Sequence, residues 1–338
     1  MIHRTLGRTN YNVSALGLGC FQFTGEFGVA PNISEALMDY AMESDINVFD
    51  TAQMYGFGES EEIVARGCWK NPDKRAYVST KIGYLHDRTV SRMRGMEAYT
   101  NITEIRRCVK HSLWISRHDC IDMLLIHEAD QPYWEIDYKT GDSVILSVLE
   151  DLKKEGLVAN IGIGVCSYDS AAVLIDTGRI DVALVAGGIT LLARPIFDKL
   201  IPAAIKHNTG IMVGAVFGQN YKYLTRKCKE DLPALLNSED QQEVVVGKRL
   251  EEIYALADEL DMDLFEMALR YVLAFDSIHT NVAGAREMAH VRANLAYIEK
   301  GPLEKDIVTK INQIQDSFIA DEASVFRLFG VPQGFIGD

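Results

Sequence analysis

The sequence predicts an α/β fold, a (β/α)8 TIM barrel that spans residues 1–338 as a single domain. Short runs rich in Val, Ile, Leu and Ala alternate with longer amphipathic stretches from one end of the chain to the other. The runs are continuously apolar, which is typical of parallel strands that are buried on both faces. Eight such units with no boundary near the middle of the chain favour a closed barrel over an open sheet.

The repeat gives an expected position for each element. Strands are expected at residues 16–20, 46–49, 77–80, 121–126, 159–163, 182–185, 211–215 and 280–283. Helices are expected at residues 34–43, 59–67, 102–115, 143–155, 167–177, 194–207, 241–260 and 287–297. Ser34 and Ser167 are expected to cap helix starts, and Gly67 and Gly156 to end helices.

Three segments lie outside the repeat. Residues 1–14 are expected to form an N-terminal hairpin that turns at residues 7–10. Residues 217–238 form a long polar insertion after the seventh strand, where barrel loops border the active-site mouth. The C-terminal tail, residues 320–338, contains several large apolar side chains, and we expect it to lie over the barrel mouth.

Composition restricts the class of protein. The chain is 48% hydrophobic and 24% charged, with a formal net charge of -14, which disfavours binding to nucleic acid or to an anionic membrane surface. No apolar run reaches the length of a membrane span, and residues 1–10 lack the apolar core of a signal peptide, so we expect a cytoplasmic protein. The six cysteines are scattered without a CxxC pair, so no metal site is expected.

Four ionisable residues follow or end the expected strands. Asp50 ends the second strand region, Lys81 and His127 end the third and fourth, and Tyr55 lies five residues after Asp50. Ionisable groups at the carboxyl ends of barrel strands are typical of catalytic sites. Each residue alone is more often structural, as a cap, a packed ring or a solvated charge. Their occurrence together at successive strand ends favours a catalytic role.

These four side chains suit carbonyl reduction. The reaction needs a proton donor for the oxygen, and a phenol such as Tyr55 is a weak acid on its own, with a pKa of about 10. The ammonium of Lys81 would lower that pKa, and the carboxylate of Asp50 would hold Lys81 charged and in place. His127 could donate a hydrogen bond to the carbonyl oxygen and polarise it.

The same segments resemble the aldo-keto reductase family over nearly the whole chain. The matching segments are LGRTNYNVSALGLGCFQFTG, INVFDTAQMYGFGESEEIVARG, VSTKIG, IDMLLIHEAD, LVANIGIGVCS and NVAGAREMAHVRAN. The resemblance places the family's catalytic tetrad on Asp50, Tyr55, Lys81 and His127. The runs IGIGVCSYDS, AGGITLL and VGAVFGQNY are similar to a branch that includes galactose, fucose and D-threo-aldose dehydrogenases.

The resemblance also implies a nicotinamide cofactor, NAD(P)H, with a slight preference for NADP and no metal. The residues expected to contact the cofactor are Gly19, Cys166, Ser167, Ile189, Phe217, Gly284, Arg286 and Asn294. Cys166 stands where the family commonly has Asn, and Ile189 where it commonly has an aromatic residue. Gly284 and His290 stand where a lysine and an arginine are often seen, which leaves Arg286 as the candidate for gripping a 2′-phosphate.

The expected function is hydride transfer between NAD(P)H and an aldehyde, a ketone or a sugar hydroxyl. Phe23, Trp134 and Tyr138 are candidates for lining the substrate pocket, with core packing as the alternative. Two other functions stay open: a cofactor-sensing regulatory barrel, and a redox-neutral lyase or epimerase that uses hydride transfer transiently. The expected partner is a small carbonyl or sugar substrate, and the protein is expected to be a monomer or a small homo-oligomer.

Overall fold

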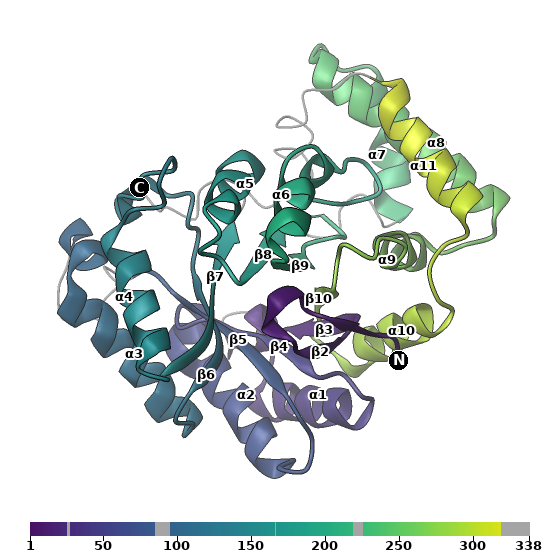
Figure 1. The fold of residues 1–338 in the computed structure, drawn as a ribbon. Coiled ribbons are helices and arrows are strands. Elements are labelled where there is room, and N and C mark those ends of the chain that lie inside the picture. The colour runs from purple at the N-terminus through teal and green to yellow at the C-terminus, as the bar shows by residue number, and fades with distance from the viewer. Residues whose placement is uncertain (26–27, 85–94, 166, 219–225, 319–338) are drawn as a thin grey trace.

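The structure of the chain is a computed structural model that describes all residues except 26–27, 85–94, 166, 219–225 and 319–338. Eight parallel strands form a closed barrel in the order β10-β3-β4-β5-β6-β7-β8-β9, with helices outside it (Figure 1). The predicted (β/α)8 barrel is therefore confirmed. Its strands are β3 (Leu16–Gly19), β4 (Val48–Asp50), β5 (Tyr77–Ile82), β6 (Ile121–Ile126), β7 (Val158–Val165), β8 (Val182–Ala186), β9 (Gly210–Gly214) and β10 (Thr280–Gly284).

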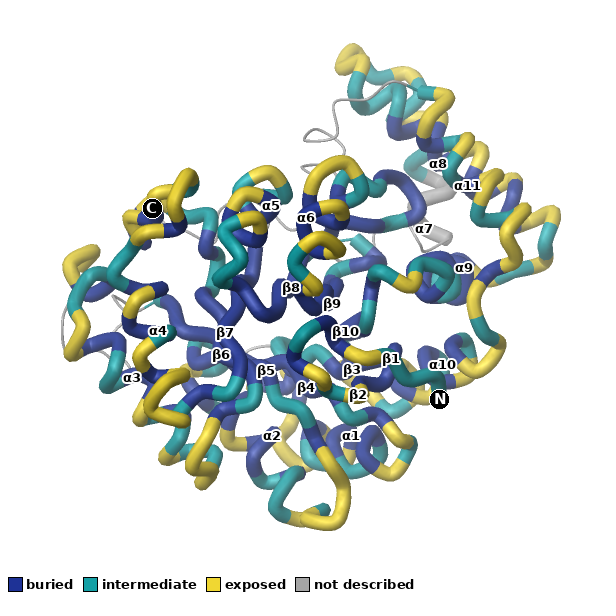
Figure 2. Tube along the Cα trace, in the orientation of Figure 1, coloured by how far each residue is buried: buried dark blue, intermediate teal, exposed yellow. Residues whose placement is uncertain are grey.

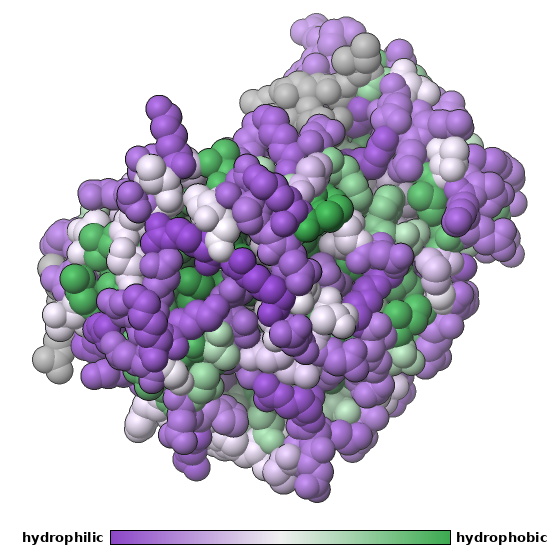
Figure 3. Space-filling view, viewed as in Figure 1, coloured by the Kyte–Doolittle hydropathy of each residue, from purple (hydrophilic) through white to green (hydrophobic). Residues whose placement is uncertain are grey.

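The helices follow the strands in sequence and cover the barrel from outside. They are α1 (Pro31–Glu43), α2 (Glu59–Lys70), α3 (Ile102–Ser116), α4 (Val144–Lys154), α5 (Tyr168–Asp176), α6 (Leu200–His207), α7 (Arg226–Leu236), α8 (Gln241–Glu259), α9 (Leu264–Leu273), α10 (Met288–Glu299) and α11 (Lys305–Ser317). The strands are buried along most of their length, whereas the helices expose their outer faces (Figure 2). The molecular face seen in Figure 3 is mostly polar, with separated apolar patches.

Side chains fill the inside of the barrel. Because side chains on a strand alternate between its two faces, every second residue points inward. Val48 and Leu125 belong to an inner apolar cluster, with Leu6 and Val13 from the N-terminal hairpin at its base. The predicted hairpin is present as β1 (His3–Thr5) paired antiparallel with β2 (Asn12–Ser14). The barrel is thus a packed core whose amino-terminal end is covered by the hairpin.

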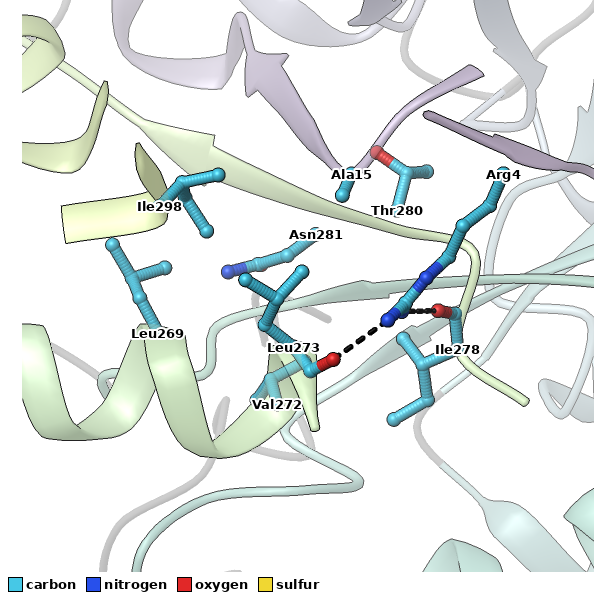
Figure 4. Close-up of a pocket in the computed structure, with 9 residues that line it drawn as sticks. All are labelled: Arg4, Ala15, Leu269, Val272, Leu273, Ile278, Thr280, Asn281 and Ile298. Carbon is cyan, nitrogen blue, oxygen red and sulfur yellow. Dashed lines mark hydrogen bonds between the residues drawn. The ribbon is translucent and has the colours of Figure 1, made fainter. Parts of the chain in front are cut away.

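A small pocket lies at this amino-terminal end (Figure 4). Arg4 of β1 donates hydrogen bonds to the carbonyl oxygens of Leu273 (2.6 Å) and Phe275 (3.1 Å). The pocket is also lined by Thr280, the first residue of β10. Since barrel active sites lie at the carboxyl ends of the strands, this pocket is at the opposite end from the candidate site.

Several expected element boundaries were wrong. Helix α1 begins at Pro31, so Ser34 lies inside it, and its hydroxyl donates to the carbonyl oxygen of Phe23 at 2.8 Å. Helix α2 continues past Gly67 to Lys70, because Gly67 is a contact point between helices. A Cβ at Gly67 would lie 2.2 Å from the Cγ of Met38 in α1.

The expectation of one helix after each strand missed three helices. Helix α7 occupies part of the segment expected to be a polar loop at 217–238, and α9 and α11 lie in segments to which no element was assigned. All three belong to the long connection after β9 or to the chain after β10. The expected tail over the barrel mouth, residues 320–338, lies outside the described residues. Among the residues described, no helix is long and apolar enough to cross a membrane.

Candidate active site

The barrel register places three of the four candidate catalytic residues on its inner face at one end. Asp50 is the last residue of β4, two positions after the inward-facing Val48. His127 follows the end of β6, two positions after the inward-facing Leu125. Lys81 lies opposite Leu125 in the β5–β6 pairing. The alternation of side chains along these strands therefore gathers the three residues above the apolar core.

Tyr55 reaches the same place from the short helix η4 (Tyr55–Gly58), directly after β4. The Nζ atom of Lys81 donates to both carboxylate oxygens of Asp50, at 2.8 and 2.7 Å, and lies 3.1 Å from the hydroxyl of Tyr55. The carbonyl oxygen of Thr51 accepts a further hydrogen bond from Nζ at 2.9 Å. The ring of His127 meets that of Tyr55 edge to face, with centroids 5.8 Å apart. The structure thus brings all four side chains together.

Burial dominates the electrostatics of Tyr55. Desolvation raises the pKa of the phenol, and the opposing effect of the Lys81 ammonium is smaller, so the net shift is upward. Lys81 lowers this pKa, as the sequence predicted, but burial has the larger effect. Burial also works to lower the pKa of Lys81, but Asp50 and Tyr55 outweigh it and the net shift is upward. At neutral pH the site therefore holds a neutral phenol beside a charged ammonium.

His127 is neutral in the same range. Burial, and then the positive charge of Lys81, hold the pKa of the imidazole well below its usual value. A neutral imidazole carries one N–H and can donate one hydrogen bond. Its buried Nδ1 atom has no hydrogen-bond partner within the part of the chain that the structure describes. The site thus combines two neutral donors, Tyr55 and His127, with the Lys81–Asp50 ion pair behind one of them.

The residues expected to line the substrate pocket support the site from behind. The indole nitrogen of Trp134 donates to the carbonyl oxygen of His127 at 3.0 Å, and the hydroxyl of Tyr138 donates to that of Ala129 at 2.9 Å. Trp134 and Phe23 have no exposed surface, whereas Tyr138 is half-buried. This burial favours the packing alternative for Phe23 and Trp134, which brace the loop and core around the site.

The residues expected to contact the cofactor lie along the same rim. Gly19 and Gly284 are the last residues of β3 and β10. Ser167, Ile189 and Phe217 follow the carboxyl ends of β7, β8 and β9. Arg286 follows β10, and Asn294 lies within α10. Ile189 is fully buried, and Phe217 packs its ring edge-on against Phe265. Cys166 lies outside the described residues.

The start of α10 suits a nucleotide phosphate. Glu287 occupies the N-cap position but makes no side-chain hydrogen bond to the first turn of the helix. Helix N-termini whose N–H groups lack a side-chain cap attract anions. Arg286, whose side chain is exposed, adds a positive charge beside them. This donor set fits the phosphate of a dinucleotide cofactor.

The loop after β8 is held by two helices from the far end of the chain. Arg249 of α8, which is 2% exposed, donates to the carbonyl oxygen of Leu192 at 2.7 Å. Arg194 donates to Gln315 of α11 at 2.6 Å and to both carboxylate oxygens of Asp316 at 2.9 and 2.8 Å. The pair α8 and α11 therefore fixes the loop that the family resemblance assigns to the nicotinamide.

A buried carboxyl group that we did not predict from the sequence lies on the outer side of the barrel wall. Glu61 of α2 is 6% exposed and accepts hydrogen bonds from the hydroxyls of Thr80 (2.6 Å) and Ser112 (2.8 Å). It also lines a pocket between α2, α3 and the strands β5 and β6. Burial is the largest effect on this carboxyl group and raises its pKa. The signal for it was the dense polar run after Tyr55, in a segment for which we predicted only a helix at residues 59–67.

Glu61 makes a testable contribution to stability. Because its folded-state pKa lies above the usual 4.5, the folded protein binds the proton more tightly than the unfolded chain. The stabilisation is present at acid pH and is lost as pH rises through the folded-state pKa. Glu61→Gln cannot titrate, so we expect its free energy of unfolding to fall less between about pH 5 and about pH 8 than that of the wild type. Urea denaturation at several pH values measures this free energy, with Glu62→Gln as the exposed control. If the free energies of unfolding of wild type and Glu61→Gln changed equally with pH, the predicted role of Glu61 would be contradicted.

Two further groups missed by sequence analysis flank His127. Tyr84 follows β5 by two residues and Glu128 follows His127 directly. The hydroxyl of Tyr84 donates to Oε2 of Glu128 at 2.8 Å. Both residues follow strand ends, so the rule that selected Lys81 and His127 could have included them.

Comparisons with known proteins agree with the resemblance that the sequence segments show. The aldo/keto reductase family model matches residues 15–316. A pyridoxal 4-dehydrogenase of Microbacterium luteolum is 24% identical over 331 residues, covering 88% of this chain and 93% of that protein. A D-threo-aldose 1-dehydrogenase of a Pseudomonas species is 25% identical over 301 residues, covering 84% and 89%. The second relative belongs to the branch that the sequence segments resemble.

A solved structure shares the fold. The holo form of an aldo-keto reductase from Bacillus halodurans superposes with a TM-score of 0.72 at 22% identity, covering 96% of this chain and 99% of that one. The fold, the family match over most of the chain and the dehydrogenase relatives agree with one another. The chain therefore belongs to the aldo/keto reductase family and is an NAD(P)-dependent oxidoreductase.

Proposed function

We propose that this protein reduces the carbonyl group of an aldehyde or a sugar, or oxidises the corresponding hydroxyl, with Tyr55 as the proton donor. The observation that carries the proposal is the contact of Lys81 Nζ with both Asp50 and the Tyr55 hydroxyl, beside the ring of His127. A bound nicotinamide supplies or accepts the hydride. The chain's own residues bind the carbonyl oxygen and move the proton.

Each residue has one role in this proposal. The neutral imidazole of His127 donates a hydrogen bond to the substrate oxygen and orients it, and the hydroxyl of Tyr55 gives that oxygen its proton. Lys81 stabilises the phenolate that remains, because an ammonium 3.1 Å away favours the charged form. Asp50 holds Lys81 charged and fixes its position.

We further propose that the segment from Gly284 to Glu287 and the start of α10 hold a phosphate group of the cofactor. Arg286 supplies the charge that selects a 2′-phosphate, which gives NADP a slight preference over NAD. We assign the adenine contact to Asn294 of α10, which is 8% exposed, because the family resemblance implies it. The substrate is a small carbonyl or sugar compound bound at the rim beside His127.

The raised pKa of Tyr55 predicts how the two directions of the reaction depend on pH. Reduction needs the protonated phenol, so we expect its rate to stay level through neutral pH and to fall only when the pH passes the raised pKa. Oxidation needs the phenolate, so its rate should increase as the pH rises toward the raised pKa of Tyr55. A nicotinamide absorbance assay with aldehydes and aldoses, run with NADH and with NADPH, measures both directions. An absence of cofactor consumption with every substrate would contradict the proposed function.

A further inference from the structure

A carboxylate and a phenol form a pair next to His127, whose ring also contacts Tyr55. The ring of Tyr84 meets the ring of His127 edge to face at 5.2 Å, and the Tyr84 hydroxyl donates to Glu128 at 2.8 Å. Tyr55, His127, Tyr84 and Glu128 are therefore consecutive neighbours in one row of side chains. The row connects the proposed proton donor to a carboxylate at the barrel rim.

The backbone fixes this pair in an unusual conformation. Tyr84 and Glu128 both have positive φ angles, 53° and 49°, which residues other than glycine rarely adopt. Gly83 allows the two segments to approach each other, because a Cβ there would lie 2.6 Å from the Cβ of His127. The two left-handed residues and this close approach fix the positions of Tyr84 and Glu128 relative to His127.

Glu128 differs in its partners from those buried acids that are paired with a cation. Asp50 is paired with Lys81, and Glu266 with Arg270 and Lys300. Within the described residues, Glu128 forms no ion pair, and the one side-chain hydrogen bond to its carboxylate comes from Tyr84. Burial is the largest effect on its pKa and raises it, and the nearby Asp130 adds to the shift.

A half-buried carboxylate without a cation is unfavourable unless other donors reach it. An ionised carboxylate offers about four acceptor sites, and Tyr84 occupies one of them. The remaining acceptor capacity lies next to Tyr84, whose ring contacts the imidazole that would orient the substrate. A substrate hydroxyl is the donor that this position suits, because it hydrogen-bonds to a carboxylate without bringing a charge.

We propose that Glu128, held in place by Tyr84, is a specificity-determining residue that accepts a hydrogen bond from a hydroxyl of the substrate. Two ring contacts separate Glu128 from Tyr55, so the hydroxyl belongs to a carbon further along the chain than the reacting carbonyl. The preferred substrates are then polyhydroxylated carbonyl compounds, and alkyl aldehydes of the same length are poorer. This inference rests on the proposed oxidoreductase function of the same site.

The test compares D-erythrose with butanal, which have the same number of carbon atoms, in wild type and in Glu128→Gln. A hydrogen bond to a charged group changes specificity by about 10- to 100-fold, so the loss in kcat/KM for erythrose should exceed the loss for butanal by that factor, mainly through KM. Tyr84→Phe should also reduce kcat/KM for erythrose more than kcat/KM for butanal, because the carboxylate loses its fixed donor while the ring against His127 is kept. Glu135→Gln, an exposed carboxylate in the following loop, is the matched control.

Equal losses for the two aldehydes would show that Glu128 acts only through His127 and would overturn the inference. Unchanged kinetics for both substrates would overturn it as well. Calorimetric binding of erythritol, a polyol without a carbonyl group, to wild type and to Glu128→Gln tests the hydroxyl contact without any turnover. A wild type that reduces neither aldehyde contradicts the proposed function, whereas the erythritol measurement still decides the role of Glu128: weaker binding by Glu128→Gln supports it, and equal or absent binding excludes it.

Discussion

Tyr55→Phe should lower kcat for carbonyl reduction by about 100-fold or more, the typical contribution of a general acid. The substitution removes only the hydroxyl that lies 3.1 Å from Lys81 Nζ and keeps the ring that packs against Phe21 and His127. Lys81 loses one acceptor but keeps both carboxylate oxygens of Asp50 and the carbonyl oxygen of Thr51, so the free energy of unfolding should change little. Stopped assays with high enzyme concentration give kcat, and urea denaturation gives the stability.

The chain offers a matched control for this variant. Tyr77 is the first residue of β5, at the opposite end of the strand that carries Lys81. Tyr77→Phe removes a hydroxyl of the same kind outside the site and should leave kcat unchanged. Similar kcat values for Tyr55→Phe and Tyr77→Phe would exclude Tyr55 as the proton donor.

Lys81→Met should reduce both stability and activity. Asp50 is 5% exposed, and the substitution leaves its carboxylate buried without its cation, which costs about 3–5 kcal/mol in comparable buried pairs. The same change removes the charge that stabilises the Tyr55 phenolate, so turnover should fall as well. Urea denaturation at neutral pH measures the stability.

The double variant Asp50→Asn/Lys81→Met separates two effects on stability: the uncompensated buried charge of Asp50 and the loss of the Lys81 side chain itself. With the carboxylate gone, no uncompensated buried charge remains, so the double variant should be more stable than Lys81→Met alone. Lys70→Met is the surface comparison, because Lys70 is exposed, its partners Glu35 and Asp39 are partly exposed, and such pairs contribute little to stability. A double variant no more stable than Lys81→Met would show that Asp50 is not the source of the destabilisation.

The sequence predicted the barrel because its strands have a simple signature. Strands buried on both faces need continuous apolar runs, and the run at β6 was located to the residue. The helices were less predictable where they depart from one helix per strand. Helix α9 begins at Leu264, and the side chain of Asp263 caps its first turn. Only four residues separate it from the end of α8, and we expected no second helix there.

Part of the candidate site was predictable because the ends of the apolar runs, and so the ends of the strands, can be read from the sequence. Asp50, Lys81 and His127 end consecutive strands, and parallel strands bring their carboxyl ends to one rim. Tyr84 and Glu128 also follow strand ends, but the contact within this pair was not predictable in the same way. The contact depends on two left-handed backbone turns and on the close approach at Gly83, and neither has a signature in periodicity or composition.

The pairing that closes the barrel also sets an order of events during synthesis. Strand β3 is among the first elements to leave the ribosome, but its partner β10 is made only after β9 and three further helices. Until then both β3 and β9 are open edges, with backbone groups free to pair with another chain. Nascent chains that stall before residue 280 would therefore be the most prone to aggregate, and protection by a chaperone would be most useful during that interval.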